Sequence, residues 1–212
     1  MRLVEGDART LLGDLHPESV DLVVTDPPYV FARGGGFADW FADLPDDAWG
    51  PILAALHRVL RPDRHLYLIS DRRTYPIFEQ AARAAGFRVH EPLIWDRDWL
   101  GLGAGAWRSQ YELVLFAEKG RRAGNSRSLG NVLRFRRPHR GYPTEKPVGL
   151  LKALIGQSSQ PGELVLDPFC GSGNLGRAAR ELGRRALLFD VDTAFAAQRL
   201  RNADGGSERA VA

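Results

Sequence analysis

The sequence has only one cysteine in 212 residues, at position 170. A single cysteine excludes an internal disulfide and a cysteine-rich metal site, and this usage is typical of the cytosol. No apolar run reaches the roughly 20 residues of a membrane-spanning helix, and Met1–Asp7 lacks the apolar segment of a secretory signal. We therefore expect a cytoplasmic protein with no metal site, no membrane partner and one sizeable core.

Acidic residues are missing from one stretch of the chain. Residues 119–144 contain one Lys, seven Arg and no Asp or Glu, so they carry +8 while the whole chain carries +3. The rest of the chain is therefore acidic, at −5. A basic strip on an acidic body indicates a polyanionic partner. A solvated loop is the alternative.

The central motif follows a predicted strand over Val20–Thr25, whose aliphatic and β-branched run is typical of a strand buried on both faces. Asp26-Pro27-Pro28-Tyr29 comes next. Neither proline can donate to a sheet, and each restricts the residue before it, so the chain leaves in an extended shape. A carboxylate, a free carbonyl and an aromatic ring are thus presented where open α/β sheets bind ligands. A proline-rich turn without function is the alternative.

A second motif lies in the last third of the chain. Its predicted order is a strand over Glu163–Leu166, a glycine turn over Asp167–Gly173, a helix over Leu175–Leu182 and a strand over Ala186–Phe189 that ends at Asp190. This is the order of a mononucleotide-binding half. The glycines let a ligand approach backbone N–H groups, and an acid at this place can accept both hydrogen bonds of a ribose diol. A dinucleotide oxidoreductase has such a turn too, but that hypothesis leaves the proline motif unexplained.

The remaining patterns alternate between strands and helices. We predict a loop over residues 30–44, with three consecutive glycines, and a turn at Arg61-Pro62-Asp63. Strands are predicted over Arg2–Glu5, His65–Ser70, Val89–Trp95 and Tyr111–Ala117. Helices are predicted over Ala8–Leu15, Asp46–Leu60, Thr74–Ala85, from the Tyr142–Pro147 segment to about Gln157, and over Thr193–Asn202.

Together these motifs resemble the DNA amino-methyltransferases that use S-adenosylmethionine, of the subgroup whose catalytic motif precedes the cofactor motif. Asp26-Pro27-Pro28-Tyr29 is similar to the catalytic motif, Asp167–Gly173 to the cofactor motif, and Pro143-Thr144-Glu145-Lys146-Pro147 to the Pro-Thr-x-Lys-Pro element. The resemblance implies one methyltransferase domain over residues 1–212. Its fold class is α/β, Rossmann-like, with a mostly parallel, doubly wound sheet and an antiparallel hairpin strand. The motif order implies circular permutation.

The resemblance also implies an activity, which is site-specific methyl transfer from S-adenosylmethionine to N6 of adenine in DNA. Alternatives are N4 of cytosine, an RNA or protein amine, and a catalytically silent cofactor-binding regulator, against which the intact Asp26 and Tyr29 argue. Asp26 and the Pro27 carbonyl would hold the amine hydrogens, and Tyr29 would stack on a base flipped from the duplex, with Pro28 completing the motif. The expected cofactor-binding residues are Asp7, Thr144, Lys146, Asp167, Pro168, Phe169, Gly171, Ser172, Gly173 and Asp190.

The alternative for Asp7 is a strand-terminating cap, and the alternative for Asp167 is a turn-stabilising acid. Cys170 is expected to be a packing residue, because cytosine C5 methylation needs a cysteine in the catalytic motif. Tyr111 stands before Glu112 where the family often has a histidine.

Residues 119–144 are too short for the large target-recognition region of the family, so we expect a basic loop in its place. Specificity would then be low, or come from a partner or a homodimer. Whether a restriction enzyme accompanies the chain in a restriction–modification system is left open. The candidate DNA contacts are Arg33, Phe37 and Trp40 in the glycine loop, and Arg134, Arg136 and Arg137 in the strip.

Overall fold

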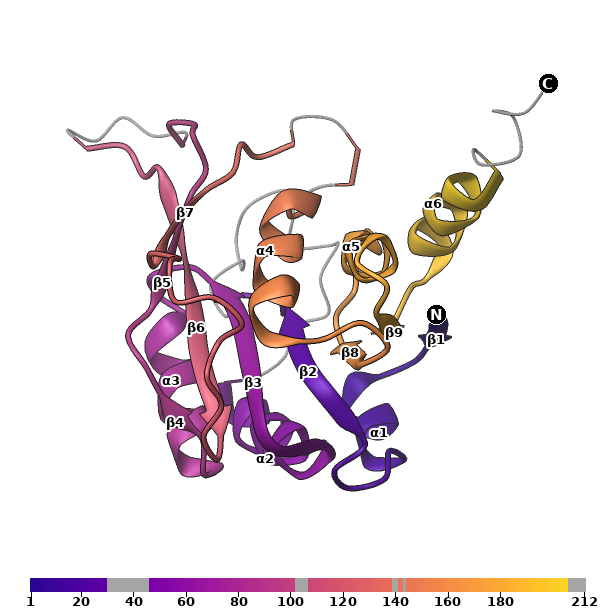
Figure 1. Ribbon diagram of the computed structural model, residues 1–212, viewed down its shortest axis with the longest axis horizontal. Helices are drawn as coiled ribbons and strands as arrows, with labels where there is room; N and C mark the ends of the chain where they lie inside the picture. Colours follow the sequence, from indigo (N-terminus) through magenta and orange to yellow (C-terminus); the bar gives the residue numbers. More distant parts are fainter. Residues whose placement is uncertain (30–45, 102–106, 139–140, 143, 206–212) are drawn as a thin grey trace.

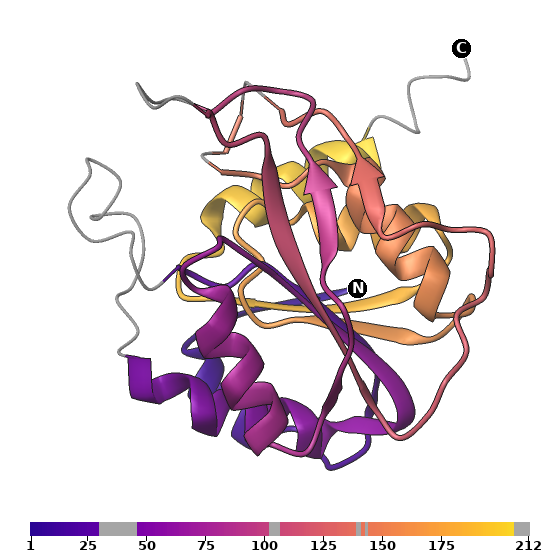
Figure 2. The ribbon, with the colours of Figure 1, turned by 90° about the vertical axis from the view of Figure 1, so that its left-hand side faces the viewer.

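One mixed sheet with helices on both of its faces forms the body of the protein (Figures 1 and 2). The structure is a computed structural model that describes residues 1–29, 46–101, 107–138, 141–142 and 144–205. Within these residues the sheet has nine strands in the order β1-β9-β8-β2-β3-β6-β5-β7, with β4 beside β6. The strands are β1 Arg2–Glu5, β2 Val20–Thr25, β3 Leu60–Ser70, β4 Arg88–Val89, β5 Leu93–Asp96, β6 Tyr111–Lys119, β7 Val132–Arg134, β8 Leu164–Asp167 and β9 Arg185–Asp190.

Among these strands, β6 alone runs against the others. It pairs antiparallel with β3, from Arg64 opposite Lys119 to Ser70 opposite Leu113, and antiparallel with β4 and β5. The pairs of β2 with β3 and β8, of β9 with β1 and β8, and of β5 with β7 are parallel. The expected mostly parallel sheet with an antiparallel hairpin strand is confirmed.

The first and last strands of the chain lie side by side. β1 pairs with β9 from Arg2 opposite Leu187 to Glu5 opposite Asp190, and both lie toward the right of Figure 1. The backbone N–H of Gly6 extends this contact by donating to the Asp190 carbonyl at 2.8 Å. The sheet is therefore continuous across the two ends of the chain, in the circularly permuted order that the motifs predict.

The helices divide into two groups, one on each face of the sheet (Figure 2). The first group packs in one core and consists of α1 Ala8–Gly13, α2 Trp49–Val59, preceded by the short η2 Asp46–Ala48, and α3 Tyr75–Ala84. The second group packs in the other core and consists of α4 Val148–Ser158, α5 Asn174–Glu181 and α6 Ala194–Gly205. Strand β2 lies between the groups: Val23 belongs to the first core, and Leu22 and Val24 to the second. Burial on both faces explains its unbroken apolar run.

The expected turn at Arg61-Pro62-Asp63 is wrong, because these residues continue β3. The partners of β2 shift from Val20 opposite Leu60 to Leu22 opposite His65, so three extra residues form a bulge. A bulge accommodates Pro62, which cannot donate to a regular ladder. The bulge also lets the Arg61 guanidinium reach the buried Asp21 carboxylate at 2.5 Å.

Three further expectations need correction. The strand expected over Val89–Trp95 is split into β4 and β5, with Pro92 between them. The helix expected to open in the Tyr142–Pro147 segment begins at Val148. Strand β7 lies inside the basic strip and pairs in parallel with β5, with Ile94 opposite Val132, so residues 119–144 are not a loop throughout. A three-residue strand at a sheet edge is too short for a periodic pattern.

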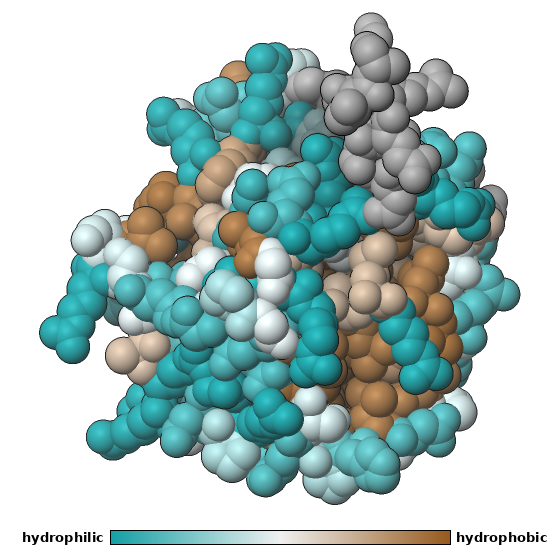
Figure 3. All heavy atoms as spheres, turned by 45° about the vertical axis from the view of Figure 1, so that its right-hand side comes forward, coloured by the Kyte–Doolittle hydropathy of each residue, from teal (hydrophilic) through white to brown (hydrophobic). Residues whose placement is uncertain are grey.

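The outer surface is mixed in character. The face turned forward in Figure 3 is mostly hydrophilic, with an apolar area toward its right-hand side. In the described part of the chain, no helix combines the length and apolar character needed to cross a membrane.

Candidate active site

The two sequence motifs meet at the carboxyl edge of the sheet. Strands β2 and β8 are parallel neighbours, so Asp26, after β2, and Asp167, at the end of β8, emerge at the same edge. The Thr25 hydroxyl joins them by donating to Asp167 Oδ1 at 2.6 Å. Asp167 Oδ1 also accepts the Phe169 N–H at 3.1 Å, which fixes the start of the glycine turn. Burial raises the pKa of Asp167 to about 7.

Three side chains form a polar cluster around Asp26. The Tyr29 hydroxyl lies 3.0 Å from Asp26 Oδ1 and 3.0 Å from Glu112 Oε2. The Lys146 ammonium donates to Asp26 Oδ2 at 2.6 Å and lies 3.4 Å from Glu112 Oε2. Glu112 comes from β6, where it stands opposite Trp95 of β5. The cluster thus combines the motif after β2, the strand β6 and the segment before α4.

The Lys146 ammonium fills the space next to two aromatic rings. Its Nζ lies 5.6 Å from the centroid of the Tyr29 ring and 5.8 Å from that of Trp95, within the range of cation–π attraction. Trp95 is held by its indole N–H, which donates to the Phe135 carbonyl at 2.8 Å. The side chain of Lys146 is 6% exposed and that of Asp26 26% exposed. The Lys146 charge therefore lies beside the Asp26 carboxylate and near the rings of Tyr29 and Trp95. Such rings can stack against a planar base.

The electrostatics of the cluster fix the charge of two of its members. Burial alone would lower the pKa of Lys146, but the Asp26 and Glu112 carboxylates outweigh it and raise that pKa. Burial and then the same carboxylates raise the pKa of Tyr29 well above its usual value. At neutral pH Lys146 is therefore charged and Tyr29 is a phenol with one hydrogen to donate. Burial raises the pKa of Asp26; Lys146 opposes this and Glu112 adds to it.

The glycine turn is fixed by backbone geometry and by Asp190. Gly171 and Gly173 have φ angles of +43° and +74°, where a side chain is strained. A Cβ on Gly173 would lie 3.1 Å from the Ala196 Cβ, so α6 packs close against the turn. Asp190 Oδ2, at the end of β9, accepts the Gly171 N–H at 2.7 Å. Burial raises the pKa of Asp190, and the hydrogen bonds from backbone N–H groups oppose it.

The other expected cofactor residues have contacts of their own. Asp7 caps α1: its Oδ1 accepts the Arg9 N–H at 2.8 Å, and the hydrogen bond from the Arg9 side chain lowers its pKa. Thr144 has a φ of +63°, and its carbonyl accepts Lys146 Nζ at 3.2 Å. The Asn174 amide donates to the Lys146 carbonyl at 2.9 Å, so the Lys-Pro segment is tied to the start of α5. Pro168 and Ser172 lie in the turn itself.

The expected DNA contacts fall into two groups. Arg33, Phe37 and Trp40 lie outside the described residues. Arg134, Arg136 and Arg137 lie on β7 and just after it. Arg134 is 71% exposed and donates to Asp96 Oδ2 at 2.8 Å.

Other charges of the basic strip support the fold. The Lys119 ammonium donates to the Leu60 carbonyl at 2.8 Å, and the Arg122 side chain, 13% exposed, lies 3.6 Å from Glu163. The strip therefore does not present all of its charge to solvent.

Cys170 is 6% exposed and belongs to the core of α4, α5 and α6. Burial raises the pKa of its thiol, which suits a packing residue and not a nucleophile. Among the described residues, His, Cys, Asp and Glu form no group of three or more that could hold a metal ion.

Sequence reasoning missed Glu112 and Trp95 as site residues. Glu112 lies at the start of an apolar strand, and its side chain is 11% exposed. The only feature of the sequence that could have indicated Glu112 is an acidic residue at the start of an apolar strand. Its contacts could not be predicted because its partners are remote in sequence, with Tyr29 83 residues away.

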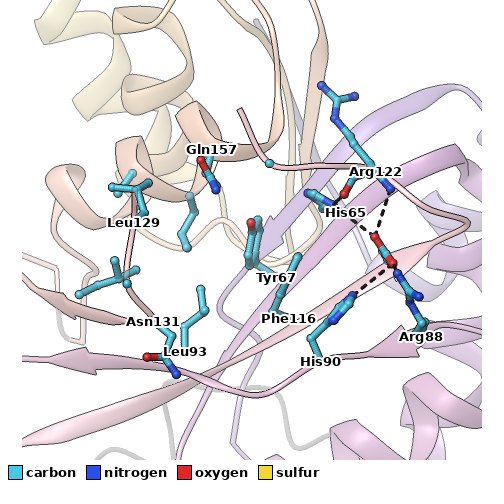
Figure 4. A pocket seen from close by; sticks show the side chains of 16 residues that line it. His65, Tyr67, Arg88, His90, Leu93, Phe116, Arg122, Leu129, Asn131 and Gln157 are labelled. Atoms are coloured by element: carbon cyan, nitrogen blue, oxygen red, sulfur yellow. Dashed lines mark hydrogen bonds and ion pairs between the residues drawn. The ribbon is translucent and has the colours of Figure 1, made fainter. Parts of the chain in front are cut away.

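A cavity of about 300 Å³ lies between β3, β6 and α4 (Figure 4), and the residues that line it do not include those of the Asp26 cluster. At its wall, His65 Nε2 and Nδ1 lie 3.0 Å from the Arg122 carbonyl and 2.6 Å from Ser158 Oγ. The carbonyl can only accept, so Nε2 carries the hydrogen, Ser158 donates to Nδ1, and the Tyr67 hydroxyl donates to Ser158 at 2.6 Å. Burial lowers the pKa of His65 to about 4, so the ring is neutral at pH 7.

Comparisons with known proteins agree with this geometry. A family model described as DNA methylase matches residues 121–199. The chain is similar to Putative methylase YubD of Escherichia coli K12, with 32% identity over 90% of this chain and 84% of that protein. It is 29% identical to DNA adenine methyltransferase YhdJ of the same organism, over 97% of this chain and 83% of YhdJ. The crystal structure of TTHA0409 from Thermus thermophilus, complexed with S-adenosyl-L-methionine, superposes with a TM-score of 0.73 and 24% identity, covering 99% of this chain and 95% of TTHA0409.

Proposed function

Since this chain belongs to the N6/N4 family of DNA methylases, we propose that it transfers a methyl group from S-adenosylmethionine to N6 of adenine in DNA. The observation that carries the proposal is the Asp26 carboxylate, set beside Tyr29 at the carboxyl edge of β2 and joined through Thr25 to the glycine turn. The choice of adenine over cytosine is supported by the similarity to YhdJ, which is named as a DNA adenine methyltransferase.

The residues of the turn fit S-adenosylmethionine. Asp190 would offer its carboxylate to a ribose diol. The N–H groups of Phe169, Gly171 and Gly173 donate to Asp167, Asp190 and the Cys170 carbonyl, so the turn is held in shape by its own hydrogen bonds. Among the described residues, Asn174 Oδ1 is buried beside this turn without a hydrogen-bond partner, as expected of an acceptor awaiting a ligand donor. When bound, the cofactor supplies an electrophilic methyl group on a sulfonium.

The Asp26 motif is suited to activating an amine. The nitrogen lone pair of an exocyclic amine is delocalised into the base, and acceptors for its two hydrogens localise that pair on nitrogen. We assign these acceptors to the Asp26 carboxylate and the Pro27 carbonyl, with the Tyr29 ring stacked on the flipped base. Asp26 would take a proton from the amine as its nitrogen is methylated, and the bound cofactor would supply the methyl group and leave as a neutral thioether. Burial raises the pKa of Asp26, which favours this transfer.

Lys146 must yield its position for this chemistry to occur. Its ammonium holds Asp26 Oδ2 at 2.6 Å, one of the acceptors that an amine would need. Glu112 Oε2 is already 3.4 Å from the same ammonium, so a small displacement transfers the charge from one carboxylate to the other. We assign Glu112 the role of a positioning residue that receives Lys146 when the base enters.

The test is methylation of DNA by the purified chain. Wild type with methyl-labelled S-adenosylmethionine should label DNA, and digestion to nucleosides should yield N6-methyladenine. Asp26→Ala should lower the rate by about 100-fold or more, the scale of losing one preorganised acceptor. Its cofactor affinity should stay within a few fold. N4-methylcytosine as the product would reject adenine, and no labelled base would reject the proposed reaction.

In this proposal, residues 1–212 form one methyltransferase domain without a separate target-recognition domain. Arg134, Arg136 and Arg137 would neutralise phosphates, and specificity beyond that would come from a second copy of the chain or a separate partner. Sedimentation with and without a DNA duplex measures the oligomeric mass and so tests for a second copy of the chain.

A further inference from the structure

The connection between β5 and β6 begins next to the Asp26 cluster. Trp95 and Glu112 stand opposite each other in the sheet, and the connection starts just past Asp96 and ends at Tyr111. Its described ends lie at the upper left of Figure 1, at the end of the molecule to which the segment after β7 also runs. At the base of the connection, the Arg97 guanidinium lies 3.6 Å from Glu112 Oε1. The cluster and the connection are therefore one continuous region.

The base of this connection is held by specific hydrogen bonds. The Arg97 N–H donates to the Gln110 carbonyl at 2.9 Å, and the Gly101 N–H to the Ser109 carbonyl at 2.7 Å. The Arg97 guanidinium donates to the same Ser109 carbonyl at 2.7 Å. A Cβ on Gly101 would lie 2.8 Å from that oxygen, so this close approach requires glycine. The two chain segments are thus placed in a defined relation to each other.

Large apolar side chains are exposed on the connection between β5 and β6. Trp107 is 95% exposed, Leu100 47%, Tyr111 46% and Trp99 44%. We call the three aromatic residues, together with Leu100, the aromatic edge. Burial of such groups stabilises a fold, so several exposed together indicate a binding surface.

The segment after β7 carries arginines of the basic strip and runs beside the base of this connection. The Phe135 N–H donates to the Asp96 carbonyl at 3.0 Å, and the Arg137 N–H to the Arg97 carbonyl at 3.2 Å. The exposed Arg134 and Arg136 flank these contacts. The Asp96 carboxylate, an acid of this region, already accepts from Arg134; Asp98 is exposed nearby.

We propose that the aromatic edge and Arg136 together form the surface that holds duplex DNA around the flipped base. Arginines bind phosphates, and an exposed tryptophan can stack on the partner base that is left unpaired when the target leaves the duplex. A surface that combines both groups beside the Asp26 cluster matches DNA in charge and in chemistry. It takes the place of a separate recognition domain. This inference rests on the proposed function and names where its substrate binds.

The test compares two surface variants with two matched controls. Trp107→Ala and Arg136→Ala remove groups of the proposed surface. Leu129→Ala removes another apolar group that is 56% exposed, and Arg83→Ala another arginine, 54% exposed, on α3. Binding to a fluorescent duplex is measured over a range of salt concentrations, with cofactor binding measured by calorimetry.

Both surface variants should bind the duplex at least about tenfold more weakly, while the controls stay within twofold and cofactor binding is unchanged. Arg136→Ala should also lower the salt slope by about one, and Trp107→Ala should leave it unchanged, because only the first contacts phosphate. A duplex with an unpaired adenine opposite an abasic site offers the tryptophan no partner base. The defect of Trp107→Ala should therefore shrink on it.

Two results overturn the inference while sparing the proposed function: a wild type that methylates DNA with both surface variants binding like the controls, or surface variants that change only the oligomeric mass. A wild type that neither binds nor methylates DNA instead contradicts the proposed function itself.

Discussion

At the scale of single residues, Asp26 and Glu112 share one ammonium and one phenol hydrogen. Tyr29 has one hydrogen for two carboxylate oxygens that each lie 3.0 Å away. Lys146 is closer to Asp26 than to Glu112, at 2.6 Å against 3.4 Å. Two arrangements of the same four groups therefore differ by a small displacement. Entry of an amine at Asp26 would favour the arrangement in which Glu112 holds Lys146.

This competition predicts opposite pH effects for two substitutions. Lys146→Met removes the charge that lowers the pKa of Asp26, so the acid limb of the pH–rate profile should move to higher pH. Glu112→Gln removes the charge that raises that pKa, so the limb should move down, and displacing Lys146 should become harder, which raises the KM for DNA. Lys152→Met, which breaks the exposed pair with Glu181, is the control and should shift nothing.

The measurement is the rate of methyl transfer against pH, with cofactor saturating. A shift of the same sign for Lys146→Met and Glu112→Gln would contradict the competition. Unchanged KM values with normal rates would show that Lys146 need not move to Glu112 for the base to enter.

At the scale of elements, the turn between β8 and α5 depends on the close packing of α6. Gly173 has a φ of +74° and would place a Cβ 3.1 Å from Ala196, whereas Gly162 has a φ of +85° and no atom within 4 Å of its Cβ position. An alanine at either position would therefore have a strained backbone, but only an alanine at Gly173 would also contact α6. Comparing the two substitutions separates the free energy of the backbone strain from that of the contact.

Gly162→Ala should destabilise the protein by about 1–2 kcal/mol, the cost of a left-handed conformation for an L-residue. Gly173→Ala should cost more, because α6 must also move, and cofactor affinity should fall about tenfold with the displaced turn. Urea unfolding and calorimetry measure the two effects. If both variants lose equal stability and bind the cofactor as wild type does, then the contact between the turn and α6 is unimportant.

At the scale of the whole molecule, two buried groups oppose each other in the dependence of stability on pH. The pKa of His65 falls from 6.5 to about 4, so the unfolded chain binds the extra proton and stability from this group is lost as pH falls from 6.5 to 4. The pKa of Asp167 rises from 3.8 to about 7, so the folded chain binds the extra proton and stability is lost as pH rises from 3.8 to 7.

Removing either group should leave the dependence of the unfolding free energy on pH that the other group causes. Relative to wild type, His65→Gln should gain unfolding free energy as pH falls from 6.5 to 4, and Asp167→Asn should gain it as pH rises from 4 to 7. Each relative slope should approach about 1.4 kcal/mol per pH unit. Urea titrations of the cofactor-free protein at pH 4.5, 5.5 and 6.5 test both, and a flat difference for either variant would show that its group titrates normally.

Much of the fold is determined by local sequence. Val20–Thr25 is apolar throughout because β2 is buried on both faces, and the prolines after it end the strand where the prediction placed the end. Proline and glycine restrict the backbone by themselves, so their positions are informative without knowledge of the neighbours. The order of the two motifs along the chain likewise determined the permuted strand order, since each motif belongs to a particular strand.

Only the tertiary structure decided which side chains meet at the site. Lys146 contacts Asp26 across 120 residues, and Glu112 enters because β6 places it opposite Trp95. The base of the connection between β5 and β6 lies beside the arginine segment because β7 pairs with β5. These contacts depend on strand register, and register is set by packing of the whole sheet, since a slip of one residue turns every side chain to the other face. Local patterns indicate which face of a strand is buried, but they do not tell which residue of a remote strand stands opposite.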